Sequence, residues 1–150
     1  MKVFGRSKDS DQKKNVLFVC VENAGRSQMA EGFFRKYSPK GYEPLSAGTR
    51  PSDINPLAIE AMREVGIDIS KQKSKILTED MIKKSTLRVN MGCVKKESCP
   101  TLFIHNVIDC NIEDPKGKSI EKVREIRDVI ESRVKELVSN VSETKQSVNT

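Results

Sequence analysis

An apolar run of strand length ends on a cysteine and leads, within a few residues, into a helix-type sequence. The run NVLFVC occupies residues 15–20, and RSQMAEGFFRKY at 26–37 carries apolar residues at helical spacing. A continuous apolar run of this length is typical of a parallel strand that is buried on both faces. The pattern therefore predicts a buried strand that ends at Cys20, followed by a short loop and a helix.

The rest of the chain continues the alternation of strands and helices. We expect strands at 42–48, 87–91 and 106–110, and helices at 55–66, 78–85 and 119–138. Pro44 favours an edge position for its strand. Asn55 and Thr78 are suited to cap the helices that follow them, and Gly66 to end the first of these. The alternation predicts an α/β fold: a single domain with a four-stranded parallel sheet and helices on both faces.

Both ends of the chain are polar and carry few apolar residues. Residues 1–14 are predicted to form a flexible basic arm and residues 139–150 a flexible polar tail, which leaves 15–138 as the folded domain. The chain has 27 Lys and Arg against 21 Asp and Glu, a net charge of +6, but the charges are scattered. No dense basic run with interleaved aromatics occurs, so a small anion is expected as ligand and nucleic acid is not.

The sequence also bears on the compartment. No run approaches the roughly 18 apolar residues of a membrane span, and no apolar signal-peptide core follows the first residues. We therefore expect a cytoplasmic protein that has no membrane partner. Thiols stay reduced in that compartment, so the four cysteines indicate chemistry more than structural disulfides.

The loop CVENAGRS at 20–27 joins the first strand to its helix, and its sequence predicts an anion-binding site. The first amides of a helix have no partners within it, and they carry the positive end of its dipole. Cys20 is the predicted nucleophile at the floor, Arg26 can clamp two oxygens of the anion, and Ser27 can donate to the sulfur. The expected oxyanion-binding residues are Val21, Glu22, Asn23, Ala24, Gly25 and Arg26. The alternative is that Cys20 is an inert cysteine at the end of a buried strand.

The segment VLFVCVENAGRSQMAEGFF resembles the phosphate-binding loop of the low-molecular-weight tyrosine phosphatase fold, and more closely that of its arsenate reductase branch. The likeness continues through SAGT at 46–49, NPLAIEAMREVGIDIS at 55–70, MGCVKKESCP at 91–100 and EDPKGKSIEKVREIRDVI at 113–130. It covers roughly residues 15–138, and it implies the phosphatase-like fold over that range. The resemblance further implies that Asp114, in the Asp-Pro turn, protonates the leaving oxygen. Taken alone, an Asp-Pro turn before a helix is a common turn sequence and does not indicate a catalytic residue.

Two functions remain open, and the other cysteines distinguish them. A phosphatase needs only Cys20, which would form a phosphocysteine that water cleaves. The resemblance to arsenate reductases implies a thiol relay, in which Cys93 attacks Cys20 first and Cys99 follows, before a thioredoxin-like reductant regenerates the enzyme. In the three-thiol branch the first resolving cysteine aligns with Gly92, and MGC…CP is closer to branches that use a small thiol instead. The order of Cys93 and Cys99 therefore stays open.

No metal or other cofactor is expected. Some reductases of the resembled family bind potassium through Asn, Glu, Ser and Asp; here Asn23, Glu31 and Ser46 match, but Lys75 takes the Asp position and its ammonium can replace the ion. A zinc set of Cys93, Cys99, His105 and Cys110 has spacings longer than the usual pairs. Cys110 ends the last predicted strand, and we interpret it as a packing residue.

Overall fold

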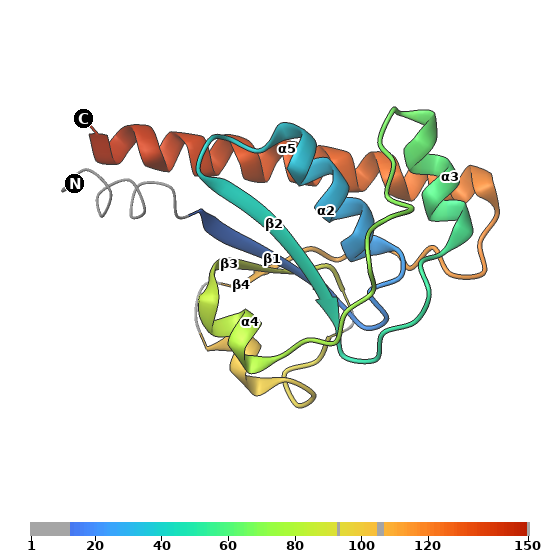
Figure 1. Ribbon diagram of the computed structural model, residues 1–150, viewed down its shortest axis with the longest axis horizontal. Helices are drawn as coiled ribbons and strands as arrows, with labels where there is room; N and C mark the ends of the chain where they lie inside the picture. The colour runs from blue at the N-terminus through green and yellow to red at the C-terminus, as the bar shows by residue number, and fades with distance from the viewer. Residues whose placement is uncertain (1–12, 93, 105–106, 150) are drawn as a thin grey trace, which may run out of the picture.

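A four-stranded parallel sheet lies at the centre of the part of the chain that the structure describes. The computed structural model describes residues 13–92, 94–104 and 107–149, with side chains up to residue 142. The strands are β1 (Lys14–Cys20), β2 (Tyr42–Gly48), β3 (Ser85–Asn90) and β4 (Val107–Asp109). Their order is β2-β1-β3-β4 (Figure 1), and every pair is parallel. The predicted sheet is confirmed, and Pro44 lies on an edge strand, as its missing N–H requires.

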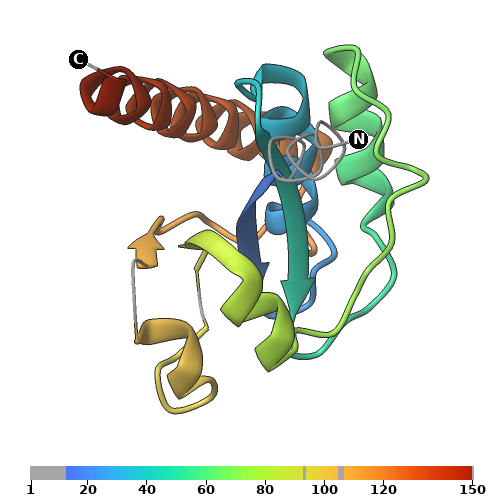
Figure 2. The same cartoon turned by 60° about the vertical axis from the view of Figure 1, so that its left-hand side comes forward.

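Helices cover both faces of the sheet, as predicted. On one face lie α2 (Arg26–Tyr37), α3 (Pro56–Glu64) and the long α5 (Ile120–Asn149), which packs against both of the others. On the other face lie α4 (Glu79–Lys84) and the 3-10 turn η1 (Pro100–Phe103), as Figure 2 shows. Among the described helices, none combines the length and the apolar content that crossing a membrane would take.

The core explains why the first strand is apolar throughout. Val16 and Phe18 of β1 pack into a cluster with α2, α3 and α5, whereas Leu17 and Val19 pack into a second cluster on the α4 side. Successive residues of a strand point to opposite faces, so a strand covered on both sides needs apolar residues at every position. Each such side chain contributes about 1.5–3 kcal/mol by leaving water.

The local signals in the sequence define several element ends. The Asn55 side chain accepts a hydrogen bond from the Leu57 N–H at 2.9 Å, and Thr78 accepts one from the Met81 N–H at 3.1 Å. Both are the caps expected from the sequence. Gly66 has a φ of +83°, a conformation that favours glycine, just beyond the end of α3. Helix α2 has the predicted bounds.

Other boundaries differ from the prediction. Helix α5 continues past Val138, the expected end, to Asn149. The prediction ended the helix where its apolar stripe ends, but no glycine or proline follows to stop the backbone hydrogen bonding. Strand β3 begins at Ser85 instead of residue 87, and β4 ends at Asp109 instead of residue 110. The predicted basic arm lies mostly outside the described residues, and Lys14 at its end belongs to β1.

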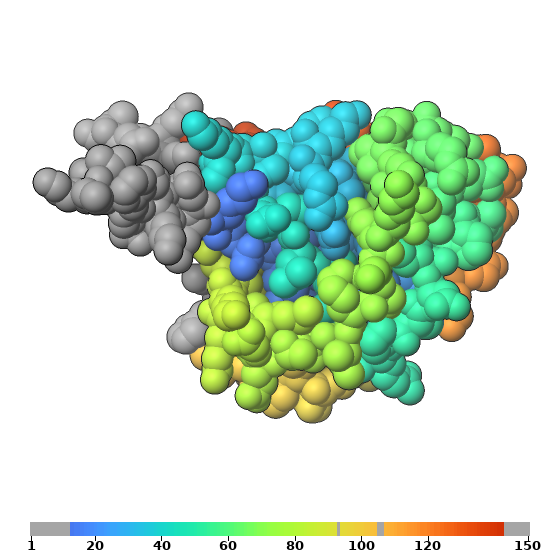
Figure 3. All heavy atoms as spheres, in the orientation of Figure 1, coloured from blue at the N-terminus to red at the C-terminus, as the bar shows by residue number. Residues whose placement is uncertain are grey.

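The carboxyl ends of β1, β2 and β3 lie at the same edge of the sheet. Figure 3 shows the molecule in the orientation of Figure 1; there α3 and the segment after it, both green, cover the right-hand side of the visible face. The loops that follow the strands gather at this edge, which is where open α/β sheets bind their ligands. Cys20 is the last residue of β1 and therefore lies there.

Candidate active site

The loop after β1 is held with its carbonyl oxygens pointing outward. The N–H groups of Arg50, Ser52 and Asn55 donate to the carbonyls of Val21, Glu22 and Ala24, at 2.8, 3.0 and 2.8 Å. The carbonyl of one residue and the N–H of the next point in opposite directions in a trans peptide. The loop's own N–H groups are therefore turned toward the cavity above Cys20, which suits an anion.

Asn23 fixes the shape of the loop. It adopts a φ of +51°, a left-handed conformation that asparagine tolerates better than most residues. Its side-chain oxygen accepts from the Lys75 N–H at 2.8 Å and from the Gln28 amide at 3.0 Å. Its backbone N–H reaches the Cys20 Sγ at 3.2 Å. One fully buried residue thus links the loop, the segment before α4 and the sulfur.

Ser27 supplies a second contact to the sulfur. Its Oγ lies 2.8 Å from Cys20 Sγ and accepts a hydrogen bond from the Asn23 side-chain amide at 2.7 Å. Because the amide occupies a lone pair of the hydroxyl oxygen, the hydroxyl proton can point at the sulfur. The Asn23 N–H and the Ser27 hydroxyl thus converge on the one sulfur, from the loop and from the start of α2.

A glycine on β2 allows the loop to approach the sheet. A Cβ on Gly48 would lie 2.6 Å from the Val21 carbonyl oxygen and 2.8 Å from the Asn23 nitrogen. Both are backbone atoms that cannot move without the loop. Gly48 is therefore required by close packing rather than by its dihedral angles.

Arg26 is aimed across the cavity by groups from the other half of the chain. Its Nη1 donates to the Ile112 carbonyl at 3.0 Å, and its Nη2 lies 3.6 Å from the Asp114 carboxylate. Gly92, with a φ of +133°, leaves room for the guanidinium: a Cβ there would lie 2.9 Å from Nη1. Arg26 is only 5% exposed, so its charge acts at the cavity rather than in bulk water.

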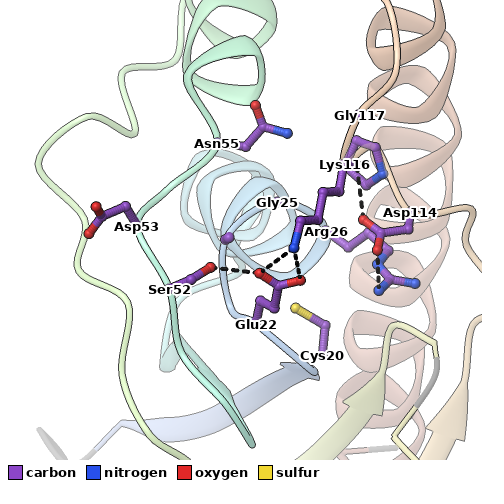
Figure 4. Close-up of a pocket in the computed structure, with 12 residues that line it drawn as sticks. Cys20, Glu22, Gly25, Arg26, Ser52, Asp53, Asn55, Asp114, Lys116 and Gly117 are labelled. Atoms are coloured by element: carbon purple, nitrogen blue, oxygen red, sulfur yellow. Dashed lines mark hydrogen bonds and ion pairs between the residues drawn. The ribbon is translucent and has the colours of Figure 1, made fainter.

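These residues surround a cavity of about 220 Å³ above Cys20 (Figure 4). The loop after β1 forms the floor, the segment after β2 one wall, and the turn before α5 the opposite wall. Its lining residues are Cys20, Glu22, Ala24, Gly25, Arg26, Ser52, Asp53, Asn55, Asp114, Pro115, Lys116 and Gly117. The structure thus brings the predicted Cys20, Arg26 and Asp114 to one place.

Asp114 lies at the mouth of this cavity. One carboxylate oxygen accepts from the Lys116 N–H at 3.0 Å, and the other faces Arg26. Its side chain is half exposed. A carboxyl in this position can exchange protons with solvent and still reach a group bound over Cys20.

Glu22 places a carboxylate on the same rim. It accepts hydrogen bonds from Ser52 Oγ at 2.8 Å and from Lys116 Nζ at 3.0 Å. The hydrogen bond from Ser52, followed by the one from Lys116, holds the pKa of Glu22 below its usual range. Glu22 therefore stays ionised across the neutral range.

Beneath the loop, Glu31 and Ser46 contact each other, and Lys75 lies beside them. Ser46 Oγ donates to Glu31 at 2.5 Å, and Lys75 Nζ lies 3.9 Å from the same carboxylate oxygen. Burial lowers the pKa of Lys75, although Glu31 opposes that effect. The lysine that takes the Asp position of the resembled potassium site thus places its ammonium next to Glu31.

Of the other cysteines, the structure describes Cys99 and Cys110, and neither lines the cavity above Cys20. Cys93 and His105 lie outside the described residues. Cys99 is half-buried and packs against the α4-side cluster, whose members include Val94 and Leu102. Cys110 is also half-buried, packed against the main core. In the described part of the chain, no group of three or more metal-ligating side chains occurs.

Sequence reasoning missed the segment that follows β2. Its backbone holds the loop, and its Ser52, Asp53 and Asn55 line the cavity. One signal was present: this segment follows the strand expected at 42–48, and loops at the carboxyl ends of parallel strands meet. The role of Lys116 was visible only as a general excess of lysines after Asp114.

The family comparison agrees with this geometry. The model for the low molecular weight phosphotyrosine protein phosphatase family matches residues 15–147. The chain belongs to this family. Among curated relatives, the arsenate reductase of Brevibacillus brevis is 38% identical over 126 residues, which cover 83% of this chain and 94% of the relative.

Solved structures similar to this chain include an arginine phosphatase and arsenate reductases. The YwlE arginine phosphatase from Geobacillus stearothermophilus has a TM-score of 0.81 at 26% identity and covers 89% of this chain and 96% of its own. An arsenate reductase in the phosphate-binding state has a TM-score of 0.75 at 35% identity, with coverages of 85% and 98%. A thioredoxin-dependent arsenate reductase of Corynebacterium glutamicum has a TM-score of 0.76 at 34% identity and covers 93% of this chain and 67% of its own.

Proposed function

We propose that this family member is an arsenate reductase with Cys20 as its nucleophile. The observation that carries the proposal is the surroundings of Cys20 Sγ, which contacts Ser27 Oγ at 2.8 Å and the Asn23 N–H at 3.2 Å. Arg26 and Asp114 face the same cavity. This combines an activated sulfur, an anion clamp and a proton donor. Relatives named arsenate reductase match over most of the chain.

In the first step, the thiolate of Cys20 attacks arsenic and forms a sulfur–arsenic bond. A hydroxyl group leaves arsenic with the bonding electrons, and Asp114 donates the one proton that lets it depart as water. Arg26 and the N–H groups of the loop hold the remaining oxygens and stabilise their negative charge. Arsenic stays pentavalent throughout this step.

In the second step, another thiolate attacks the Cys20 sulfur. The sulfur–arsenic bond breaks and its electron pair stays on arsenic, which becomes trivalent and leaves as arsenite. The two sulfurs are oxidised to a disulfide. Cys93 and Cys99 are the proposed resolving thiols. Because Cys99 packs against the α4-side cluster and is absent from the described lining of the cavity, Cys99 must move to take part.

A dithiol reductant completes the cycle by reducing the disulfide. We assign this role to a thioredoxin-like protein, with a small thiol as the second option. The thioredoxin dependence of the Corynebacterium glutamicum reductase supports the first choice. The proposal places the reaction in the cytoplasm, where such reductants keep thiols reduced.

A phosphatase reaction is the second candidate, because the same residues can serve it. Cys20 would form a phosphocysteine, and Asp114 would first protonate the leaving group and then activate water. The shared family and the likeness to an arginine phosphatase favour at least a side activity. Cys93 and Cys99 have no role in this reaction.

One set of assays separates the candidates. Arsenite formation is measured with thioredoxin, thioredoxin reductase and NADPH, and then with glutathione; hydrolysis of 4-nitrophenyl phosphate is measured in parallel. Cys20→Ser should abolish both activities. Cys93→Ser and Cys99→Ser should abolish only arsenite formation with thioredoxin, while Cys110→Ser, the matched control, retains it. Wild-type arsenate reduction in both Cys93→Ser and Cys99→Ser would exclude the relay.

A further inference from the structure

Two charged side chains meet across the mouth of the Cys20 cavity. Lys116 Nζ, from the turn before α5, lies 3.0 Å from one carboxylate oxygen of Glu22 and 3.3 Å from the other. Ser52 Oγ, from the segment after β2, donates to the same carboxylate at 2.8 Å. Figure 4 shows Lys116 reaching across to Glu22. We call Glu22 and Lys116 the rim pair.

A carboxylate on an anion-binding loop needs an explanation. Alone, the charge of Glu22 would repel an incoming oxyanion and weaken its binding. Lys116 neutralises that charge, and Ser52 satisfies one of its oxygens. The rim pair is therefore neutral overall, and it cannot be there to attract anions. Its remaining effect is on the space at the mouth.

Both residues of the rim pair line the Cys20 cavity, and both are more exposed than the sulfur. Cys20 is 2% exposed, whereas the side chains of Glu22 and Lys116 are 30% and 70% exposed. A bare tetrahedral oxyanion can bind at the floor beneath the pair. The organic substituent of a phosphate ester must instead leave through the mouth, where the two side chains meet.

We propose that the rim pair is a specificity determinant that favours unsubstituted tetrahedral oxyanions over their esters. This inference rests on the proposed function, because it takes the Cys20 cavity as the anion site. It adds that Glu22 and Lys116 limit the size of the ligand. An ester binds only after Lys116 has left Glu22, which removes the ion pair and exposes the carboxylate of Glu22 beside the anion. A small anion binds with the pair intact.

The pair's exposure sets the size of the effect. Exposed ion pairs contribute a factor of up to about five to an equilibrium constant. Removing the pair by substitution should therefore lower the ratio of phosphate affinity to ester affinity by about three- to fivefold. Ester binding is disfavoured by this amount rather than excluded.

The test uses binding, so that it does not depend on turnover. Phosphate and phenyl phosphate are titrated calorimetrically into the full chain carrying Cys20→Ser. The same titrations follow after adding Glu22→Gln and Lys116→Ala together, which removes the pair without changing net charge. Lys116→Ala keeps the backbone N–H that holds Asp114. The ratio of phosphate to phenyl phosphate affinity should fall by about three- to fivefold.

A neighbouring ion pair provides the control. Lys118 lies 3.8 Å from Glu113 in the same turn, and neither residue lines the described cavity. Glu113→Gln with Lys118→Ala, also neutral in net charge, should leave the ratio unchanged. Lys116→Arg, which retains a cation opposite Glu22, should preserve the parent ratio. An equal ratio in the parent and the rim variants, or an equal shift in the control, would overturn the proposal.

The outcome is separable from that of the proposed function. A ratio that stays fixed while the wild-type chain reduces arsenate rejects only the role of the rim pair. A ratio that falls as expected in a chain that forms no arsenite rejects only the arsenate reductase assignment. A parent chain that binds neither anion rejects both.

Discussion

Arg26 and Asp114 face each other across the Cys20 cavity, with 3.6 Å between the guanidinium Nη2 and the carboxylate Oδ2. The two residues come from opposite ends of the folded domain, one from the start of α2 and the other from the turn before α5. Arg26 is nearly buried, whereas the side chain of Asp114 is half exposed. The pair is thus fixed on one side and movable on the other, which suits an anion clamp beside a proton donor.

Asp114→Asn should separate chemistry from binding. The asparagine keeps the size of the side chain but cannot donate a proton to a leaving oxygen, so kcat should fall by about a hundredfold or more for arsenate reduction. Phosphate should bind at least as tightly as before, because a carboxylate near the anion has been neutralised. Steady-state assays and phosphate titration measure the two effects. A parallel loss of phosphate binding would show that Asp114 instead holds Arg26 in place.

Ser27→Ala should make Cys20 less reactive. The change removes the hydroxyl that lies 2.8 Å from the sulfur. A hydrogen bond of this kind is worth about 1 kcal/mol, so the rate of Cys20 alkylation by iodoacetamide at pH 7 should fall about fivefold. Site-resolved mass spectrometry follows the reaction. Ser132→Ala, on the exposed face of α5, is the control and should react like wild type; an unchanged rate in Ser27→Ala would remove Ser27 from the site.

Gly48→Ala should distort the anion loop. Its Cβ would press on the backbone of Val21 and Asn23, and relief requires the loop to move. We expect a loss of about 1–3 kcal/mol in the free energy of unfolding, together with a loss of phosphate binding. Gly41→Ala is the comparison: its φ of +94° makes the substitution strained, but no atom lies within 4 Å of the added carbon. It should lose stability and still bind phosphate. Normal binding by Gly48→Ala would show that the loop tolerates the shift.

The elements of the fold follow from local patterns, and so they could be predicted. The ends of α2, the caps at Asn55 and Thr78, and the edge position of Pro44 each depend on a few neighbouring residues. The predicted active-site loop depends on one continuous segment as well. In each of these places, local preference and tertiary packing favour the same structure.

The parts that could not be predicted depend on contacts between distant segments. The backbone of Arg50, Ser52 and Asn55 holds the loop after β1, and Lys116 meets Glu22 from the far end of the domain. The sequence of the loop after β1 does not indicate which distant residues contact it, and the sequences of those residues do not indicate the loop. The end of α5 was missed for a different reason, because helix bounds were judged from the apolar stripe and the backbone continues beyond it.

Cys110 should behave as a packing residue rather than a reactive thiol. Burial raises the pKa of this thiol above its ordinary value of 9.0. The folded state therefore favours the neutral thiol. Below pH 9.0 the thiol is neutral in both states, and only above that pH does ionisation of Cys110 in the unfolded chain reduce stability. At pH 8, Cys110 should be alkylated more slowly in the native protein than in urea, measured peptide by peptide. Equal rates in the two states would contradict its burial.

The ammonium of Lys75 should make the enzyme independent of potassium. Lys75 Nζ lies 3.9 Å from Glu31, so a cation is already present beside that carboxylate. Replacing KCl by NaCl should leave the wild-type melting temperature and activity unchanged. Lys75→Asp removes this cation and adds a second carboxylate near Glu31 and Ser46, which are oxygen ligands suited to an alkali ion. Potassium at a hundred times its Kd should then stabilise the variant by about 2.7 kcal/mol over sodium. Lys71→Asp makes the same charge change at an exposed position and should show no such preference; a wild-type protein already stabilised by potassium would mean that the ammonium does not replace the ion.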